Sequence, residues 1–114
     1  MKKSHKFLKA KPFTLTTLLN YQGGSIVSRE IIRQDTGTVT VFAFAKGQGL
    51  SEHTASFDAL IYILDGSAKI TVAGNIHEVK SGEMIILPAH KPHALEAVKQ
   101  FKMVLVMIRN IPKK

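Results

Sequence analysis

Short runs rich in valine, isoleucine, phenylalanine and threonine follow one another along most of the chain, bounded by glycine, aspartate, asparagine or serine. Such runs predict β-strands, because branched and aromatic side chains fit a pleated surface and the bounding residues favour turns. We expect strands in the segments SIVSREIIRQ, TVTVFAFAK, DALIYIL, SAKITV, IHEVK, EMIIL and FKMVLVMIR, with a turn at Asp65 and Gly66 between the third and the fourth. About eight strands with a turn roughly every ten residues predict an all-β sandwich or barrel.

The segment before the first strand has a different pattern. In FTLTTLLNY, residues 13–21, the phenylalanine and the leucines recur within about one helical turn of one another. Gly23 and Gly24 then interrupt the pattern. We therefore expect a short helix or turn ahead of the sheet.

Two of the expected strands are apolar at both alternating positions. DALIYIL is apolar on both faces after its first residue, and only Lys102 and Arg109 interrupt FKMVLVMIR. A strand with one face in water should alternate between apolar and polar residues. We therefore expect the outer face of this sheet to pack against a second subunit in a homodimer. The alternative is that the N-terminal segment folds back over that face.

The composition is that of a globular protein, since 45% of the 114 residues are hydrophobic. A chain of this length fits one domain. It contains no cysteine, so it forms no disulfide and needs no oxidising compartment. No apolar run reaches the roughly 20 residues that span a bilayer. We therefore expect a cytoplasmic protein with no membrane partner.

The net charge of +8 invites comparison with nucleic-acid-binding proteins, because clustered lysine and arginine neutralise phosphates. Seven of the sixteen basic residues, however, lie in the terminal segments 1–11 and 113–114, which leaves nine basic residues against eight acidic ones elsewhere. Lysines at chain ends are solvated and aid solubility. A nucleic-acid partner is therefore not expected.

Glycine, proline and histidine occur at two regular spacings. Gly47 is followed after five residues by His53, and Gly66 closes this first frame. Gly82 is followed after five residues by Pro88, and His93 ends the second frame. The two frames, in this order on an all-β chain, resemble the two sequence motifs of small bacterial cupins of the conserved-barrel type.

The cupin resemblance implies a double-stranded β-helix, the jelly-roll barrel of that family, preceded by a short helical or irregular segment. It implies one domain over residues 1–114, with the barrel core at about 25–110 and basic tails at 1–11 and 113–114. It also implies that His53 and His93 face each other inside the mouth of the barrel.

Two of the ligand positions in the cupin metal motif are changed. Where the family has a second histidine and a glutamate, this chain has Ala55 and Ala59. His53 and His93 remain as ligands for a divalent transition metal such as Zn, Ni, Fe or Mn, with His90 or His77 as a third. A metal site usually has three or four protein ligands, so we do not expect a tightly bound cofactor.

The resemblance therefore favours a protein that binds a small organic molecule in the barrel, near His53, Phe57, His90 and His93. Methionines 84, 103 and 107 are further candidates for the wall of a ligand cavity, because this side chain adapts to varied shapes. Arg29 and Arg33 flank Glu30 and could bind a carboxylate, although both could also be plain surface residues.

Two other functions stay open from the sequence. One is a metal-dependent enzyme of the dioxygenase or isomerase type, with an incomplete histidine site. The other is a structural or interaction module, which a pocket of about 300 Å³ or more at the two histidines would disfavour. The residues assign no catalytic role, although a histidine pair without metal could carry out acid–base catalysis.

Overall fold

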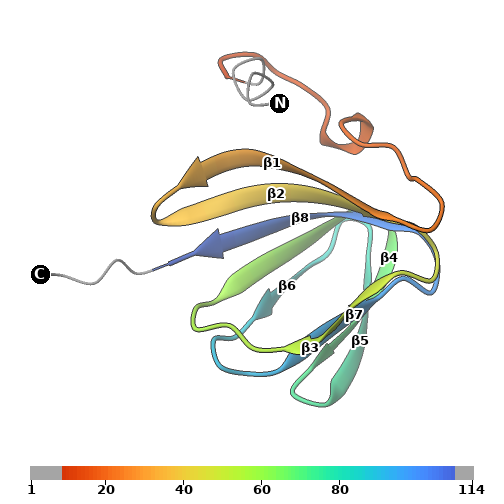
Figure 1. Ribbon diagram of the computed structural model, residues 1–114, viewed down its shortest axis with the longest axis vertical. Coiled ribbons are helices and arrows are strands. Elements are labelled where there is room, and N and C mark those ends of the chain that lie inside the picture. Colours follow the sequence, from red (N-terminus) through yellow and green to blue (C-terminus); the bar gives the residue numbers. More distant parts are fainter. Residues whose placement is uncertain (1–8, 110–114) are drawn as a thin grey trace, which may run out of the picture.

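The computed structural model describes residues 9–109, which form eight strands after a single turn of 3-10 helix (Figure 1). The elements in chain order are η1 (Leu15–Thr17), β1 (Ile26–Gln34), β2 (Gly37–Phe44), β3 (Gly49–His53), β4 (Ala59–Val72), β5 (Asn75–Lys80), β6 (Met84–Leu87), β7 (His93–Glu96) and β8 (Phe101–Ile108). The short helix before an all-β body matches the expectation from residues 13–21. No helix within residues 9–109 is long and apolar enough to cross a membrane.

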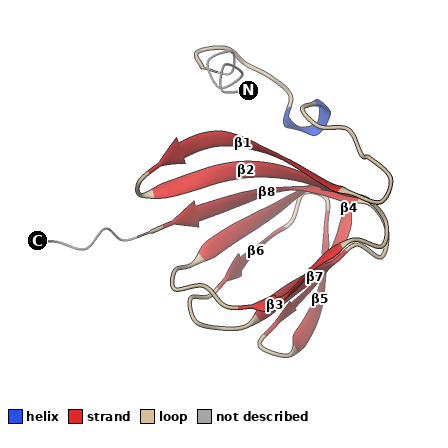
Figure 2. Cartoon of the chain, viewed as in Figure 1, coloured by secondary structure: helices blue, strands red, loops and turns tan. Residues whose placement is uncertain are grey.

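The strands form one curled antiparallel sheet in the order β1-β2-β8-β4-β7-β3, with β5 and β6 also paired to β4 (Figure 2). The first half of β4 pairs with β8 and β6, and its second half pairs with β7 and β5. Because β4 belongs to both halves of the sheet, it folds one half over the other and closes an all-β barrel.

The expected turn at Asp65 and Gly66 is wrong, because β4 runs through both residues as one strand. The register with β8 shifts between Ile63 and Asp65, so a β-bulge bends the strand. Gly66 has a φ of +75°, and a Cβ at this position would lie 2.4 Å from the carbonyl oxygen of Gln100. A turn signal in the sequence thus marks a bend within a long strand. The seven expected segments did not include the short strands β3 and β7.

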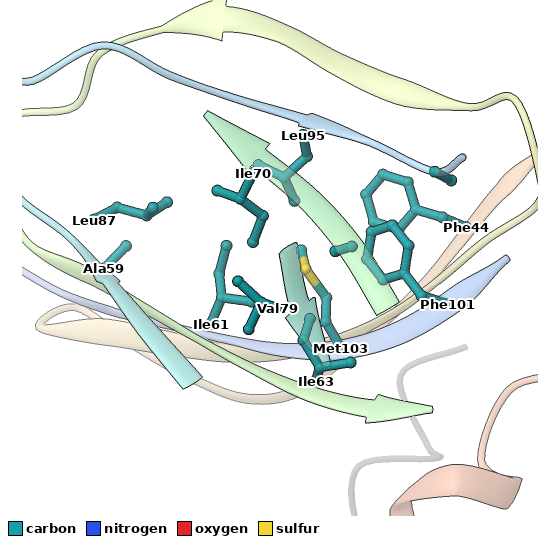
Figure 3. Packing of buried hydrophobic residues seen from close by; sticks show 12 residues of the cluster. Phe44, Ala59, Ile61, Ile63, Ile70, Val79, Leu87, Leu95, Phe101 and Met103 are labelled. Carbon is teal, nitrogen blue, oxygen red and sulfur yellow. The ribbon is translucent and has the colours of Figure 1, made fainter. Parts of the chain in front are cut away.

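A hydrophobic core fills the inside of the barrel (Figure 3). At one end the rings of Phe44 and Phe101 stack with their centroids 4.5 Å apart. Figure 3 shows Ala59 and Leu87 toward the other end of the same core. The largest side chains therefore occupy one end of the barrel, and the opposite end is left to smaller ones.

The N-terminal segment packs on the outer face of the sheet. Leu19 is buried against a cluster that includes Val41 and Val104. The Lys102 amine donates a hydrogen bond to the carbonyl of Thr16 and lies over the ring of Tyr21. The N-terminal segment therefore folds back over the part of this face that β2 and β8 form. This was the alternative to covering of the face by a second subunit.

Tyr21 adds a second attachment for the N-terminal segment, because its hydroxyl donates a hydrogen bond to the Asp65 carboxylate. Burial, together with this bond, raises the pKa of Tyr21 above its usual value. The tyrosine therefore stays protonated and keeps donating to Asp65 across the physiological pH range. The bend in β4 is thus tied directly to the covering segment.

Candidate functional site

Two histidines meet at the mouth of the barrel, as the resemblance implied. His53 ends β3 and His93 begins β7, and the two residues are direct partners in the register between these strands. Their rings meet edge to face with centroids 4.4 Å apart, and the two Nε2 atoms are 3.2 Å apart. His93 is 5% exposed, whereas His53 lies open to solvent.

Hydrogen bonds between two loops hold the mouth in shape. The loop from residue 54 to 58 follows β3, and the loop from 88 to 92 precedes β7. The Asp58 carboxylate accepts a hydrogen bond of 2.8 Å from the backbone N–H of Ala89. The backbone N–H of His90 donates one of 2.7 Å to the carbonyl of Ala55. These contacts join the loops that adjoin the two histidines and so fix the distance between the rings.

The backbone sets the tautomer of both rings. Nδ1 of His53 is 2.8 Å from the carbonyl oxygen of Ser51, and Nδ1 of His93 is 3.2 Å from that of Lys91. A carbonyl oxygen only accepts hydrogen bonds, so we assign a proton to each Nδ1. A neutral imidazole carries one such proton, and both Nε2 atoms are then bare acceptors facing each other.

Two bare nitrogens at 3.2 Å repel unless something positive lies between them. One proton shared between the two Nε2 atoms as an N–H···N hydrogen bond removes this repulsion and gives the pair a single positive charge. A second proton is opposed, because burial and the neighbouring His53 lower the pKa of His93. The pair can therefore share at most one proton, and that proton lies between the two facing Nε2 atoms.

A small apolar cavity of about 70 Å³ adjoins the histidine pair. Ala55 and Ala59, the two residues at the altered motif positions, are part of its wall. The remaining wall consists of Leu50, Ile61, Leu87, Leu95, Met103, Leu105 and Met107. The cavity is well below the 300 Å³ that would argue against a purely structural role, and it admits only a small part of a ligand.

The donor set does not complete a metal site of the usual kind. The two Nε2 atoms converge closely enough for a single ion to bind both. Within residues 9–109, however, no group of three or more histidine, cysteine, aspartate or glutamate side chains is placed to hold a metal. Two neutral nitrogens also leave the charge of a divalent ion uncompensated. The site therefore falls short of the three or four protein ligands that hold a metal firmly.

The fold agrees with the comparison of this chain with known proteins. The family model of the cupin domain matches residues 40–109, which include both histidines and both motif frames. The chain belongs to the cupin family. Among curated proteins, none matches this cupin.

Solved structures of other bacterial cupins resemble it over most of its length. A conserved protein of unknown function from Streptococcus pyogenes is 35% identical, with 90% of each chain covered and a TM-score of 0.85. A cupin 2 conserved barrel domain protein from Leptotrichia buccalis is 41% identical with a TM-score of 0.82, over 85% of this cupin and 47% of that protein. A cupin superfamily protein from Desulfitobacterium hafniense is 27% identical, with a TM-score of 0.84 and coverage of 90% and 94%.

Of the other residues singled out from the sequence, only Met103 and Met107 line the cavity beside the histidine pair. His77 on β5 and His90 in the loop before β7 are both exposed, and neither lines the cavity. Phe57 also stays outside the cavity wall, with its ring 5.9 Å from the guanidinium carbon of Arg109. Met103 and Met107 line the cavity, but the expectation for Met84 is wrong because it is exposed on the opposite face of the sheet.

Sequence reasoning overlooked five of the eleven residues of the cavity wall, all of them leucine or isoleucine. Leu50, Leu87 and Leu95 come from three strands that meet only after the sheet has curled. Arg109 was treated as an interruption of an apolar strand. The two-residue period of a strand places Arg109 on the same face as Met107, and this signal could have associated it with the mouth.

Proposed function

We propose that this cupin binds a small organic molecule at the barrel mouth near His53 and His93, with an apolar group in the cavity and a polar group outside it at the mouth. The observation that carries the proposal is the cavity itself. It is apolar on every side except at the histidine pair, whose ring nitrogens are the polar atoms of its wall. Its small volume restricts the enclosed group to roughly the size of a branched alkyl chain.

The test uses 4-methylpentan-1-ol as a neutral probe and methyl NMR of methionine as the readout. Met103 and Met107 line the cavity, whereas Met84 is on the outside of the barrel and serves as an internal control. We expect the first two methyl signals to shift at about 10 mM probe, since so small a ligand has a roughly millimolar Kd.

A blocking variant makes this test specific to the cavity. Ala55→Leu places a larger side chain at the mouth from a loop position and should abolish the shifts. Unchanged Met103 and Met107 signals in the wild-type protein would contradict the proposal. Equal shifts at Met84 would show that the probe binds without selectivity.

The second candidate that the sequence leaves open is a metal-dependent enzyme with an incomplete histidine site. In that case a divalent transition metal would be held by His53 and His93, and it would supply Lewis-acid chemistry at the mouth. Zinc or nickel titration in competition with a weak chelator separates the two candidates. Stoichiometric metal binding that is lost in His93→Ala would favour the enzyme. If the protein does not compete with the chelator for the metal, the binding of an organic molecule remains the better supported function.

We also propose that this cupin forms a homodimer through the outer face of its sheet. The N-terminal segment covers one part of that face, but Ile32, Met84 and Ile86 remain 50%, 57% and 58% exposed on it. Exposed apolar patches of this kind mark interfaces. Sedimentation at micromolar concentration should give a dimer that Ile86→Glu dissociates. A monomer alone would exclude the dimer.

A cytoplasmic location completes the proposal. It is supported by the absence of cysteine from the chain, which leaves no disulfide to form in an oxidising compartment. Fractionation of cells that produce the protein, with detection by an antibody, tests it. Recovery in the periplasmic or membrane fraction would contradict it.

A further inference from the structure

A second hollow lies at the rim of the same barrel mouth. It has a volume of about 290 Å³ and is lined by Arg33, Gln34, Asp35, Thr38 and Arg109. These residues come from the end of β1, the β1–β2 turn, the start of β2 and the residue after β8. Figure 1 shows this turn, the end of β8 and the loop after β3 at one end of the barrel. The rim hollow is therefore at the same end of the barrel as the loop that follows His53.

Strand register places the rim hollow next to the apolar cavity. Thr38 of the rim is the direct partner of Met107, which lines the cavity, and directly opposed residues share a face of the sheet. Arg109 lies two residues after Met107 and so shares that face too. A ligand with its apolar end in the cavity would therefore extend along this face toward the rim.

Arg109 is available to bind a ligand. It forms no ion pair within residues 9–109, and its guanidinium lies over the Phe57 ring. Contact through the flat face of a guanidinium leaves its N–H groups free to donate at the edge. The bond directions of those N–H groups match the two oxygens of a carboxylate.

Thr38 provides a second and independent indication. It is 5% exposed, and its hydroxyl oxygen is buried without a hydrogen-bond partner within residues 9–109. Buried hydroxyls in folded proteins are almost always hydrogen-bonded, so an unpaired one at the wall of a hollow points to a partner that binds there. A ligand oxygen would provide that partner after a small rotation of the threonine side chain.

The acidic residues at the rim limit the charge that the ligand carries. Arg33 is paired with Glu30 at 2.8 Å, and the Asp35 carboxylate borders the same hollow. A doubly charged phosphate would be repelled by the Asp35 carboxylate more strongly than a singly charged group. The rim therefore favours a monoanion, and the planar fork of Arg109 favours a carboxylate among monoanions.

We propose that the ligand of this cupin is a small monocarboxylate with a branched apolar tail, whose carboxylate is bound at the rim by Arg109 with help from Thr38. The inference rests on the proposed function, because the tail occupies the cavity beside His53 and His93. It adds the charge of the ligand and the residue that selects it.

The experiment compares 4-methylpentanoate with 4-methylpentan-1-ol, which has the same branched tail and carbon skeleton but no charge. Affinities come from the Met103 and Met107 methyl shifts. We expect the acid to bind about tenfold more tightly than the alcohol, as one charge-assisted fork would give. Arg109→Gln should remove this preference while leaving the affinity for the alcohol unchanged.

Two further variants check the sign and the location of the effect. Asp35→Asn removes a repelling charge from the rim and should tighten binding of the acid about threefold. Arg29→Gln removes a positive charge from the same strand, but from its outer face, and should leave both affinities unchanged. Equal losses in Arg29→Gln and Arg109→Gln would overturn the proposal, because they would show only a general charge effect.

The outcomes separate this inference from the proposed function. If the alcohol shifts both methionine signals and the acid binds no more tightly, the binding barrel stands and the carboxylate inference fails. If the acid keeps its advantage in Arg109→Gln, the inference also fails. If neither probe shifts the signals, both proposals fail.

Discussion

The two ends of the barrel are built from the same strands but are filled differently. At the closed end Phe44 and Phe101 are fully buried and stack against each other. At the mouth, Ala55 and Ala59 and the histidine pair border an apolar cavity of about 70 Å³. Protein interiors are otherwise close-packed, so an unfilled apolar space is a local exception. Large rings secure the fold at one end, and small side chains leave room for a ligand at the other.

The two ends also differ in how residue types match the backbone. Gly66, in the β4 bend near Phe101, has a φ of +75°, which glycine adopts without strain. His90, in a mouth loop, has a φ of +67°. A side chain in this left-handed conformation is strained. The closed end is thus relaxed, and some strain is retained beside the histidine pair.

The largest expected effect comes from emptying the closed end. Phe101→Ala removes a fully buried ring and should lower the free energy of unfolding by about 3–5 kcal/mol, measured by urea denaturation. Met107→Ala at the mouth should cost only about 1 kcal/mol, because this side chain is half-buried beside existing space. Equal losses would mean that the mouth is packed as tightly as the closed end.

A smaller loss should follow from Gly66→Ala at the bend of β4. The added Cβ would lie 2.4 Å from a backbone oxygen in a left-handed conformation, which should cost about 2–3 kcal/mol in the free energy of unfolding. Gly74→Ala is the matched control, since Gly74 also has a positive φ but its Cβ would have no neighbour within 4 Å. A loss in Gly66→Ala no greater than in Gly74→Ala would refute the role of the close approach.

The mouth should make stability depend on pH. The pKa of His93 is lowered in the folded protein by burial and by His53, so the unfolded chain binds more protons as the pH falls below the ordinary histidine value of 6.5. The free energy of unfolding should therefore decrease below about pH 6.5, by at most about 1.4 kcal/mol per pH unit for one proton.

Variants of two histidines locate this pH effect. His93→Gln should flatten the acid side of the stability profile, measured by urea denaturation between pH 5 and pH 8. His90→Gln, which changes an exposed histidine of the neighbouring loop, should leave the profile as in the wild type. A profile that is unaltered in His93→Gln would show that other groups control the dependence.

The smallest effect is expected from His90→Gly. Relieving the left-handed strain should outweigh the added flexibility of glycine and raise the free energy of unfolding by about 0.5 kcal/mol. Urea denaturation measures the change, with Ala89→Gly in the same loop as a control that should not stabilise. A loss of stability in His90→Gly would show that the histidine side chain forms contacts worth more than the strain.

The structure also shows where a reading of the sequence fails. The signal at Asp65 and Gly66 was correct for a change of direction, but a bulge within a strand and a hairpin turn use the same residue types. The sequence showed that β4 is apolar on both faces. It did not show that Leu19 covers the outer face, because this depends on how the N-terminal segment docks on the sheet. Local residue preferences carry no information about such docking.

The sequence by itself determined the all-β fold, because that depends on strand periodicity. Its two spaced frames carried the resemblance to cupins, and that resemblance implied the histidine pair. Only the tertiary structure decided the volume of the cavity, the facing Nε2 atoms and the rim formed by Arg33, Thr38 and Arg109. The physical reason is that a cavity and its rim are spaces between strands far apart in sequence. Their shape depends on the curl of the sheet and on the packing of every side chain around them.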